Sequence, residues 1–228
     1  MKILAAVLGL LFLANIGCSK DKTELTTEKD KISYSIGTDI GNSLKRQEID
    51  VDTDVLFKGI RDVMTGGKLL LTDEEMRSTM DEFRNKMIAK QQDKMKELGE
   101  KNKEEGEAFL AENKKDKDVV TLPSGLQYKV ITEGDGAMPK ATDKVTVNYR
   151  GTLIDGTEFD SSYTRGQPAS FPVNGVIPGW TEALQLMKAG SKWKLFIPSN
   201  LAYGERGAGG KIGPNAALIF EVELISVN

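Results

Sequence analysis

The spacing of apolar residues changes near residue 118, and this change constrains the fold more than any other feature of the chain. Before it, apolar residues recur every four positions, as at Ile32, Ile36, Ile40 and Leu44, which predicts amphipathic helices. After it they alternate with polar residues, as in 126–130, which predicts strands. We therefore predict an α+β fold, with helices first and an antiparallel sheet after them.

The first region, residues 19–71, is predicted to form two helices. Thr27 is a suitable N-cap for the first, and the second runs from about Thr53 to Gly66-Gly67. Two short helices cannot bury their apolar stripes by themselves. The pair must pack on the rest of the chain or on a second copy, and we favour a homodimer formed through residues 19–71.

Residues 72–117 contain the longest helical pattern. Thr72-Asp73-Glu74-Glu75 forms a capping box, and an unbroken helix of about 40 residues would extend roughly 60 Å. The stretch 91–107 is mostly charged, so we expect a helix that lies largely in water. Gly99 and Gly106 weaken such a helix, which leaves a frayed linker as the alternative.

Residues 118–228 show strand patterns separated by turn residues such as Asp155-Gly156. Only one short helix fits, from Pro178 at its start to Met187, with Gly190 just beyond it. This region is predicted to be an antiparallel sheet with a single helix.

The first 18 residues are typical of a bacterial secretory signal. Lys2 precedes an apolar run, Ile3–Leu13, that is short for a membrane-spanning helix. Cys18 occupies the position of a lipidated cysteine, which Gly17 fits and Asn15 does not. We expect a lipid-anchored protein of the outer membrane, with an unlipidated periplasmic or secreted protein as the alternative.

The composition excludes several kinds of chemistry. The chain of 228 residues has no histidine and one cysteine, so one chain cannot form a Ser-His-Asp triad, a histidine zinc site or an internal disulfide. The net charge of −3 is spread along the sequence, which gives no broad basic face for nucleic acid. We expect no metal and no cofactor.

Five strings in 118–228 resemble the FKBP-type peptidyl-prolyl isomerases. Their shared order over about 110 residues is specific, and the helices and signal extend the likeness to the macrophage infectivity potentiator (Mip) branch. The strings are 147–151 (Val-Asn-Tyr-Arg-Gly), 156–162 (Gly-Thr-Glu-Phe-Asp-Ser-Ser), 176–180 (Val-Ile-Pro-Gly-Trp), 201–204 (Leu-Ala-Tyr-Gly) and 218–220 (Leu-Ile-Phe).

The resemblance implies an apolar pocket that accelerates X-Pro rotation. Trp180 would be its floor, the Ile177 N–H and the Tyr203 hydroxyl would bind substrate carbonyls, and Asp160 would lie beside the reacting amide. The implied catalytic residues are Tyr149, Phe159, Asp160, Ile177, Trp180, Tyr203 and Phe220, and the implied substrate-binding residues are Arg165, Phe171, Val176 and Ile212. Two positions depart from the family pattern: Pro168-Ala169 lacks a bulky aromatic residue, and Lys211 stands where an aliphatic residue is common.

A pocket that favours a twisted amide needs no nucleophile, base or metal, so the lack of histidine fits this activity. The implied partners are proline-containing segments of unfolded or secreted proteins, and macrolide inhibitors of the FKBP class. Two alternatives remain open: a holdase chaperone that uses the pocket only for binding, and a host-interaction lipoprotein built on the same scaffold.

Overall fold

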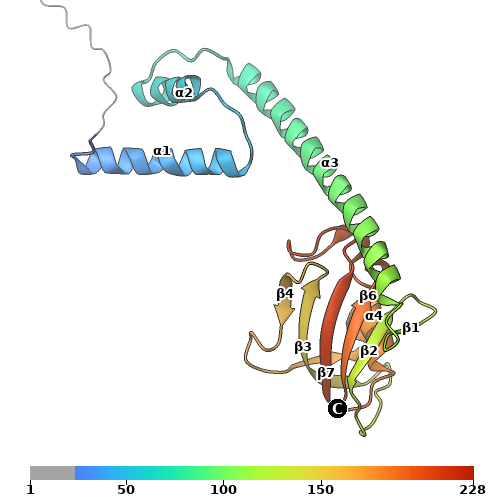
Figure 1. Ribbon diagram of the computed structural model, residues 1–228. Coiled ribbons are helices and arrows are strands. Elements are labelled where there is room, and N and C mark those ends of the chain that lie inside the picture. The colour runs from blue at the N-terminus through green and yellow to red at the C-terminus, as the bar shows by residue number, and fades with distance from the viewer. Residues whose placement is uncertain (1–23) are drawn as a thin grey trace, which may run out of the picture. The chain divides into compact units, whose positions relative to one another are not determined.

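The computed structural model describes residues 24–228 (Figure 1). The predicted signal and Cys18 lie outside these residues. The chain forms two compact units, the first ending at Thr72 and the second spanning Asp73–Asn228. Among the described residues no helix is both long and apolar enough to cross a bilayer.

The first unit contains the two predicted helices, α1 (Glu28–Arg46) and α2 (Thr53–Thr65). The side chain of Thr27 accepts a hydrogen bond from the Asp30 N–H, and Oδ2 of Asp30 accepts one from the Thr27 N–H, both at 3.1 Å. This reciprocal pair is a capping box, so the predicted start of the first helix is confirmed. Gly66 ends α2 in the left-handed conformation, with φ of 68°.

Helix α3 (Asp73–Asn113) is continuous, and it passes through Gly99 and Gly106 without a break. Both glycines are buried because they let the helix approach the sheet domain closely. A Cβ on Gly99 would lie 3.1 Å from Cβ of Pro214, and one on Gly106 would lie 3.1 Å from Cβ of Ala217. The frayed alternative is therefore wrong, since close packing outweighs the low helix propensity of glycine.

The last turns of α3, beyond the charged stretch 91–107, also pack against the sheet domain. The rings of Phe109 and Phe196 lie 6.0 Å apart, and Asn113 Nδ2 donates to Gln127 Oε1 at 2.8 Å. Gln127, which is buried in β2 (Gln127–Thr132), also donates to the Leu110 carbonyl at 2.9 Å. One side of α3 thus belongs to the second unit, while the division of the chain between residues 117 and 118 stays a prediction.

The second unit is built around one antiparallel sheet of seven strands in the order β1-β2-β6-β7-β3-β4, with β5 paired to β3 (Figure 1). The predicted sheet is confirmed, and its two longest strands, β3 and β7, lie side by side at its centre. The strands are β1 (Val120–Thr121), β2, β3 (Lys144–Leu153), β4 (Glu158–Ser161), β5 (Ala169–Pro172), β6 (Lys192–Ile197) and β7 (Leu218–Val227).

The sheet buries its apolar face against α4 (Pro178–Leu184). Trp180 and Leu184 of this helix join Val147, Leu195 and Val222 of the strands in one core. The helix ends at Leu184, three residues before the predicted end at Met187. The N–H groups of residues 186 and 187 instead donate to the carbonyls of residues 183 and 184 in tight turns. Three short 3₁₀ helices complete the unit: η1 (Val173–Gly175), η2 (Ser199–Leu201) and η3 (Gly204–Arg206).

Candidate active site

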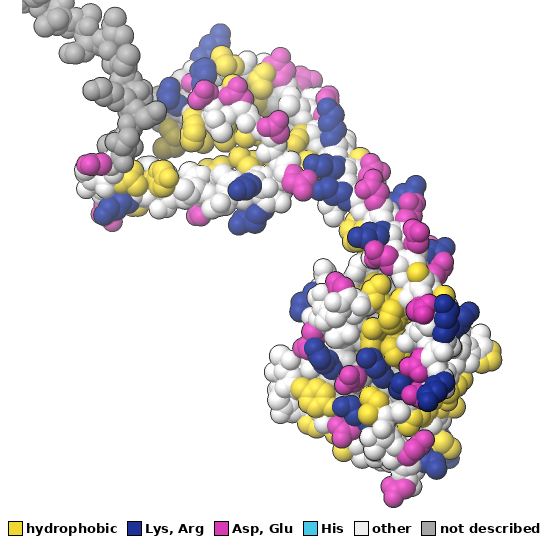
Figure 2. All heavy atoms as spheres, viewed as in Figure 1, with side chains coloured by type: hydrophobic (Ala, Val, Ile, Leu, Met, Phe, Trp, Pro, Cys, Tyr) yellow, Lys and Arg dark blue, Asp and Glu magenta, His cyan; other side chains and the backbone are white. Residues whose placement is uncertain are grey.

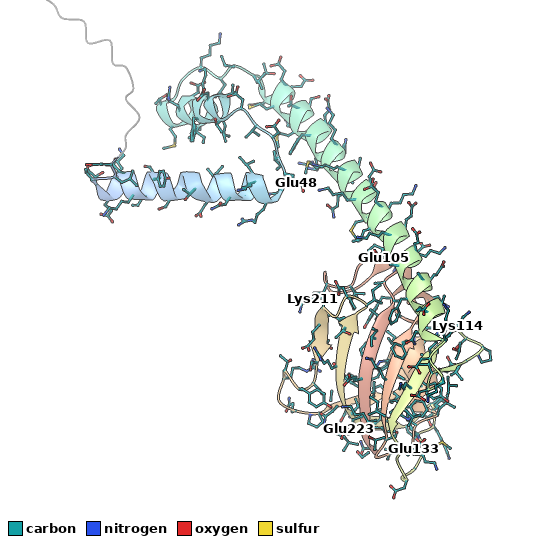
Figure 3. All side chains as sticks on the ribbon, viewed as in Figure 1. Glu48, Glu105, Lys114, Glu133, Lys211 and Glu223 are labelled. Atoms are coloured by element: carbon teal, nitrogen blue, oxygen red, sulfur yellow. The ribbon has the colours of Figure 1, made fainter. Side chains whose placement is uncertain are left out.

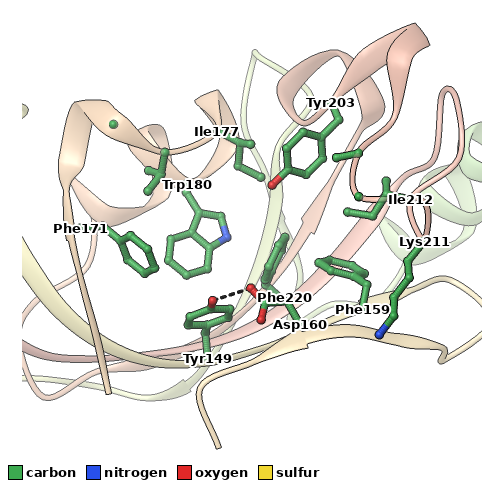
Figure 4. Close-up of a pocket in the computed structure, with 14 residues that line it drawn as sticks. Tyr149, Phe159, Asp160, Phe171, Ile177, Trp180, Tyr203, Lys211, Ile212 and Phe220 are labelled. Carbon is green, nitrogen blue, oxygen red and sulfur yellow. Dashed lines mark hydrogen bonds between the residues drawn. The ribbon is translucent and has the colours of Figure 1, made fainter. Parts of the chain in front are cut away.

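A cavity of about 560 Å³ opens between α4, strands β3 to β5, the start of β7 and the loop that follows β6 (Figure 4). Its volume lies within the range of small-molecule and peptide pockets. All residues that the resemblance placed in the pocket line it, except Arg165. The lining residues are Tyr149, Phe159, Asp160, Phe171, Gly175, Val176, Ile177, Trp180, Tyr203, Ala208, Gly209, Lys211, Ile212 and Phe220.

Trp180 lies at the base of the cavity and is only 3% exposed. Three rings meet its indole nearly at right angles: Tyr149 at 5.3 Å, Phe220 at 5.2 Å and Phe171 at 6.0 Å between ring centroids. Such edge-to-face contacts stabilise the rings beyond the burial of their area. The floor of the cavity is therefore a fixed aromatic surface rather than a collection of mobile side chains.

Gly151 explains how two of the aromatic walls come together. It lies on β3, where the rings of Phe159 and Phe220 meet with centroids 5.4 Å apart. A Cβ at residue 151 would lie 2.6 Å from Phe159 and 2.7 Å from Phe220. The glycine in the string 147–151 thus leaves room for the wall of the cavity.

Tyr149, Asp160 and Arg165 form a hydrogen-bonded cluster at one edge of the cavity. The Tyr149 hydroxyl donates to Asp160 Oδ2 at 2.6 Å and accepts from Arg165 Nη2 at 2.6 Å, and Arg165 Nη1 also donates to Asp160 Oδ1. Burial by itself raises the pKa of Asp160, but the bonds from Tyr149 and Arg165 outweigh it and hold that pKa below its usual value. The carboxylate therefore stays charged at neutral pH.

Three hydrogen-bond donors at the cavity have no acceptor among the described residues. They are the Trp180 indole N–H, the Ile177 backbone N–H and the Tyr203 hydroxyl. Burial, with the nearby carboxylate of Asp160, raises the pKa of Tyr203, so its hydroxyl keeps its proton. A peptide in the cavity could accept hydrogen bonds from all three.

The residue-by-residue resemblance missed four lining residues: Gly175, Ala208, Gly209 and Lys211. Three of them come from the loop between Gly204 and Pro214. The resemblance placed this loop at the cavity through Ile212, and the departure at Lys211 was the signal that a further residue of the loop differs there. Phe159 and Asp160 both lie on strand β4, which pairs with β3.

The side chains at the floor of the cavity are suited to binding the apolar part of a peptide segment. They offer aromatic and aliphatic surface, uncommitted donors and a carboxylate neutralised by Arg165. Within residues 24–228 no cluster of three or more acidic or cysteine side chains could hold a metal ion. The arrangement can shelter a bond from water while holding the flanking carbonyls.

Two family models match the chain. The model described as FKBP-type peptidyl-prolyl cis-trans isomerase matches residues 136–225, and the one described as the domain amino terminal to it matches residues 29–130. The first range contains every lining residue of the cavity.

Curated relatives extend the match to the whole chain. The "Outer membrane protein MIP" of Legionella longbeachae is 52% identical over 227 residues, covering 100% of this chain and 97% of the relative. The "Peptidyl-prolyl cis-trans isomerase Mip" of Coxiella burnetii is 50% identical over 205 residues, covering 90% of this chain and 89% of the relative. The crystal structure of FkpA from Escherichia coli superposes with a TM-score of 0.75 at 42% identity, covering 90% of this chain and 99% of that one. The chain belongs to the FKBP-type peptidyl-prolyl cis-trans isomerases.

Proposed function

We propose that this isomerase accelerates X-Pro rotation in unfolded or secreted proteins by sheltering the twisted amide in the cavity above Trp180. The observation that carries the proposal is the combination of a buried indole floor with donors that lack a protein acceptor. The substrate's proline ring lies on the indole, and the flanking carbonyls accept hydrogen bonds from Ile177 and Tyr203.

The physical reason lies in the amide itself. Rotation breaks the resonance of the peptide bond, with a barrier of about 18–20 kcal/mol, and isomerisation of X-Pro bonds is correspondingly slow. The twisted state has lost conjugation and is less dipolar than either planar form. An apolar cavity that excludes water therefore destabilises the planar forms more than the twisted one.

Asp160 lies beside the reacting amide and is not a general base. Rotation transfers no proton, and the hydrogen bonds from Tyr149 and Arg165 already occupy the carboxylate. Its role is electrostatic: it fixes the edge of the cavity and holds Tyr149 against the indole.

The test compares two buried tryptophans. Trp180 and Trp193 are 3% and 6% exposed, but only Trp180 lines the cavity. We expect Trp180→Leu to lose at least about ten-fold in kcat/KM, measured by NMR magnetisation exchange on a prolyl peptide, because the floor is lost. Trp193→Leu is the control for loss of core packing, and equal losses of activity in the two variants would contradict the assignment.

The same cavity is proposed to take macrolide inhibitors of the FKBP class. A macrolide in the cavity would cover the indole of Trp180 and exclude the peptide. The expected result is competitive inhibition together with a change in tryptophan fluorescence that Trp180→Leu abolishes and Trp193→Leu retains.

The first unit is proposed to join two chains. No residue of α1 or α2 is buried, and the apolar side chains of Ile36, Val55 and Met64 are 57%, 62% and 81% exposed. Figure 2 shows hydrophobic side chains at the surface of this unit. Exposed apolar surface of this extent favours a partner, and a second copy offers a matching face.

Sedimentation of the protein without residues 1–18 tests this pairing. We expect a dimer that Ile36→Glu converts to a monomer, while Lys45→Glu on the same helix leaves it intact. A monomer that instead suppresses the aggregation of a proline-free client through these faces would favour the holdase alternative.

Attachment to the cell envelope through a lipid on Cys18 is also proposed. It is supported by the sequence around Gly17-Cys18 and by the name of the Legionella relative. Metabolic labelling with palmitate should mark the protein in the membrane fraction, and Cys18→Ala should abolish both the label and the membrane association. An unlabelled wild-type protein in the periplasmic fraction would contradict the proposal.

A further inference from the structure

Lys211 places a positive charge at the rim of the cavity. It lines the same cavity as Trp180 and Phe159, and its side chain runs beside Phe159 toward the edge formed by β4 (Figure 4). The residue is exposed, so its ammonium group is in contact with water.

The other charges near the cavity already have partners. Asp160 is paired with Arg165, and Glu158 is paired with Arg150 at 2.7 Å and accepts a bond from Thr164 at 3.0 Å. Among the described residues no carboxylate forms an ion pair with Lys211; the pKa of Glu158 is lowered first by its hydrogen bond with Arg150 and only in smaller part by the charge of Lys211. Its charge is therefore available to a bound peptide.

The backbone that carries Lys211 is firmly held. Ala208 and Ile212 exchange two backbone hydrogen bonds, at 2.9 and 3.0 Å, across the turn that contains Lys211. The buried side chain of Ile212 anchors this turn in the cavity wall. Only the side chain of Lys211 is free to follow a ligand.

Helix α3 fixes the other end of the loop. Asn102 Nδ2 donates to the Pro214 carbonyl at 2.8 Å, and Asn215 Nδ2 donates to the Gly99 carbonyl at 3.3 Å. Figure 3 shows Lys211 at the same end of the sheet as Glu105 of α3. The backbone on both sides of Lys211 is thus held against the rest of the domain, while its side chain can adjust to a ligand.

We propose that Lys211 makes the enzyme prefer proline sites with an acidic side chain within two residues of the proline. This inference rests on the proposed function, because it assumes that the peptide binds above Trp180. An ion pair exposed to solvent contributes modestly, so the expected preference for Glu over Gln is about two- to five-fold in kcat/KM at low salt. It should vanish near 1 M salt, where the screening length is about 3 Å.

The experiment uses two pairs of peptides and NMR magnetisation exchange, which requires no coupled protease. One pair carries Glu or Gln directly before proline, and the other carries Glu or Gln two positions after it. The wild-type protein should show the preference in at least one pair. Lys211→Gln should reduce the Glu:Gln ratio to about one, and Lys211→Glu should invert it.

Arg206→Gln is the matched control, since Arg206 lies on the same loop, is exposed and does not line the cavity. It removes the same charge and should leave the Glu:Gln ratio at the wild-type value. A wild-type ratio near one in both pairs, or an equal fall in Lys211→Gln and Arg206→Gln, would overturn the role of Lys211. If the wild-type protein accelerates the exchange of none of the four peptides, the proposed function is overturned instead.

Discussion

The hydroxyl of Tyr149 lies 2.6 Å from Oδ2 of Asp160 and donates its proton to it, while the Tyr149 ring packs edge-on against Trp180. One side chain thus connects the carboxylate at the edge of the cavity to its aromatic floor. Arg165 completes the cluster, with its guanidinium 5.2 Å from the centre of the Tyr149 ring. The geometry of the cavity depends on this polar cluster as well as on its apolar walls.

Tyr149→Phe should raise the pKa of Asp160 toward its usual value, because the hydroxyl bond is one of the causes that lower it. The lost hydrogen bond should also reduce the free energy of unfolding by about 1 kcal/mol. Carbon-13 NMR titration of the carboxylates and urea unfolding measure the two effects. Tyr163→Phe is the control, since Tyr163 is half exposed and donates only weakly to Glu223, at 3.4 Å. If the pKa of Asp160 is unchanged in Tyr149→Phe, the Tyr149 hydroxyl does not help to lower it.

The isomerase rate should not depend on pH between about pH 5 and pH 9. The pKa of Asp160 is lowered, so the stability that its charge contributes is present above its unfolded-state pKa and is lost only as pH falls through the lower folded value. The pKa values of Tyr149 and Tyr203 are raised, so both hydroxyls stay protonated over the same range. Magnetisation exchange at a series of pH values measures the profile, and a bell-shaped curve centred near neutral pH would contradict rotation without proton transfer.

Removing α3 should destabilise the sheet domain. A protein of residues 118–228 lacks the contact of Phe109 with Phe196 and the bonds of Asn102 and Asn113 to the domain. Compared with residues 73–228, it should lose about 3 kcal/mol or more in urea unfolding. Amide hydrogen exchange should also become faster in the loop that carries Lys211. Identical unfolding curves for the two proteins would mean that α3 does not stabilise the sheet domain.

Two substitutions on α3 distinguish the effect of its packing against the sheet domain from the effect of helix propensity. Gly106→Val places side-chain atoms against Ala217, where a Cβ alone already comes within 3.1 Å, so a loss of about 1–3 kcal/mol is expected. Glu104→Val introduces the same residue at an exposed position of α3 and should change the unfolding free energy much less. Equal losses would mean that the helix does not pack closely at residue 106.

Gly151→Ala on β3 should displace the aromatic side chains that form the wall of the cavity. The added methyl group would lie within 2.7 Å of both Phe159 and Phe220, so the rings must move or the strand must shift. We expect a loss of about 1–3 kcal/mol in stability and a larger relative loss in kcat/KM. Thr152→Ala on the same strand is the control. A Gly151→Ala protein with wild-type activity would show that the activity does not depend on the contact between the Phe159 and Phe220 rings at Gly151.

The sequence predicts the elements whose signals are local. The cap at Thr27, the end of α2 at Gly66 and the alternation in the central strands follow from residues close together in the chain. Gly99 and Gly106 supported the frayed alternative to the predicted long helix because their partners, Pro214 and Ala217, lie more than 100 residues away in the sequence. The resemblance assigned Ile212 to the pocket and marked Lys211 only as a departure, but the folded loop brings both residues to the cavity. The resemblance to the family therefore predicts most of the residues that line the pocket, while contacts between distant segments determine how its rim is held.

The most direct test of the account is the rate of cis-to-trans exchange of a prolyl peptide in the presence of the purified protein, with Trp180→Leu alongside. We expect the wild-type protein to accelerate the exchange clearly, Trp180→Leu to lose most of this acceleration and Trp193→Leu to retain it. Exchange at the spontaneous rate, in a wild-type protein that still binds a macrolide at Trp180, would contradict it.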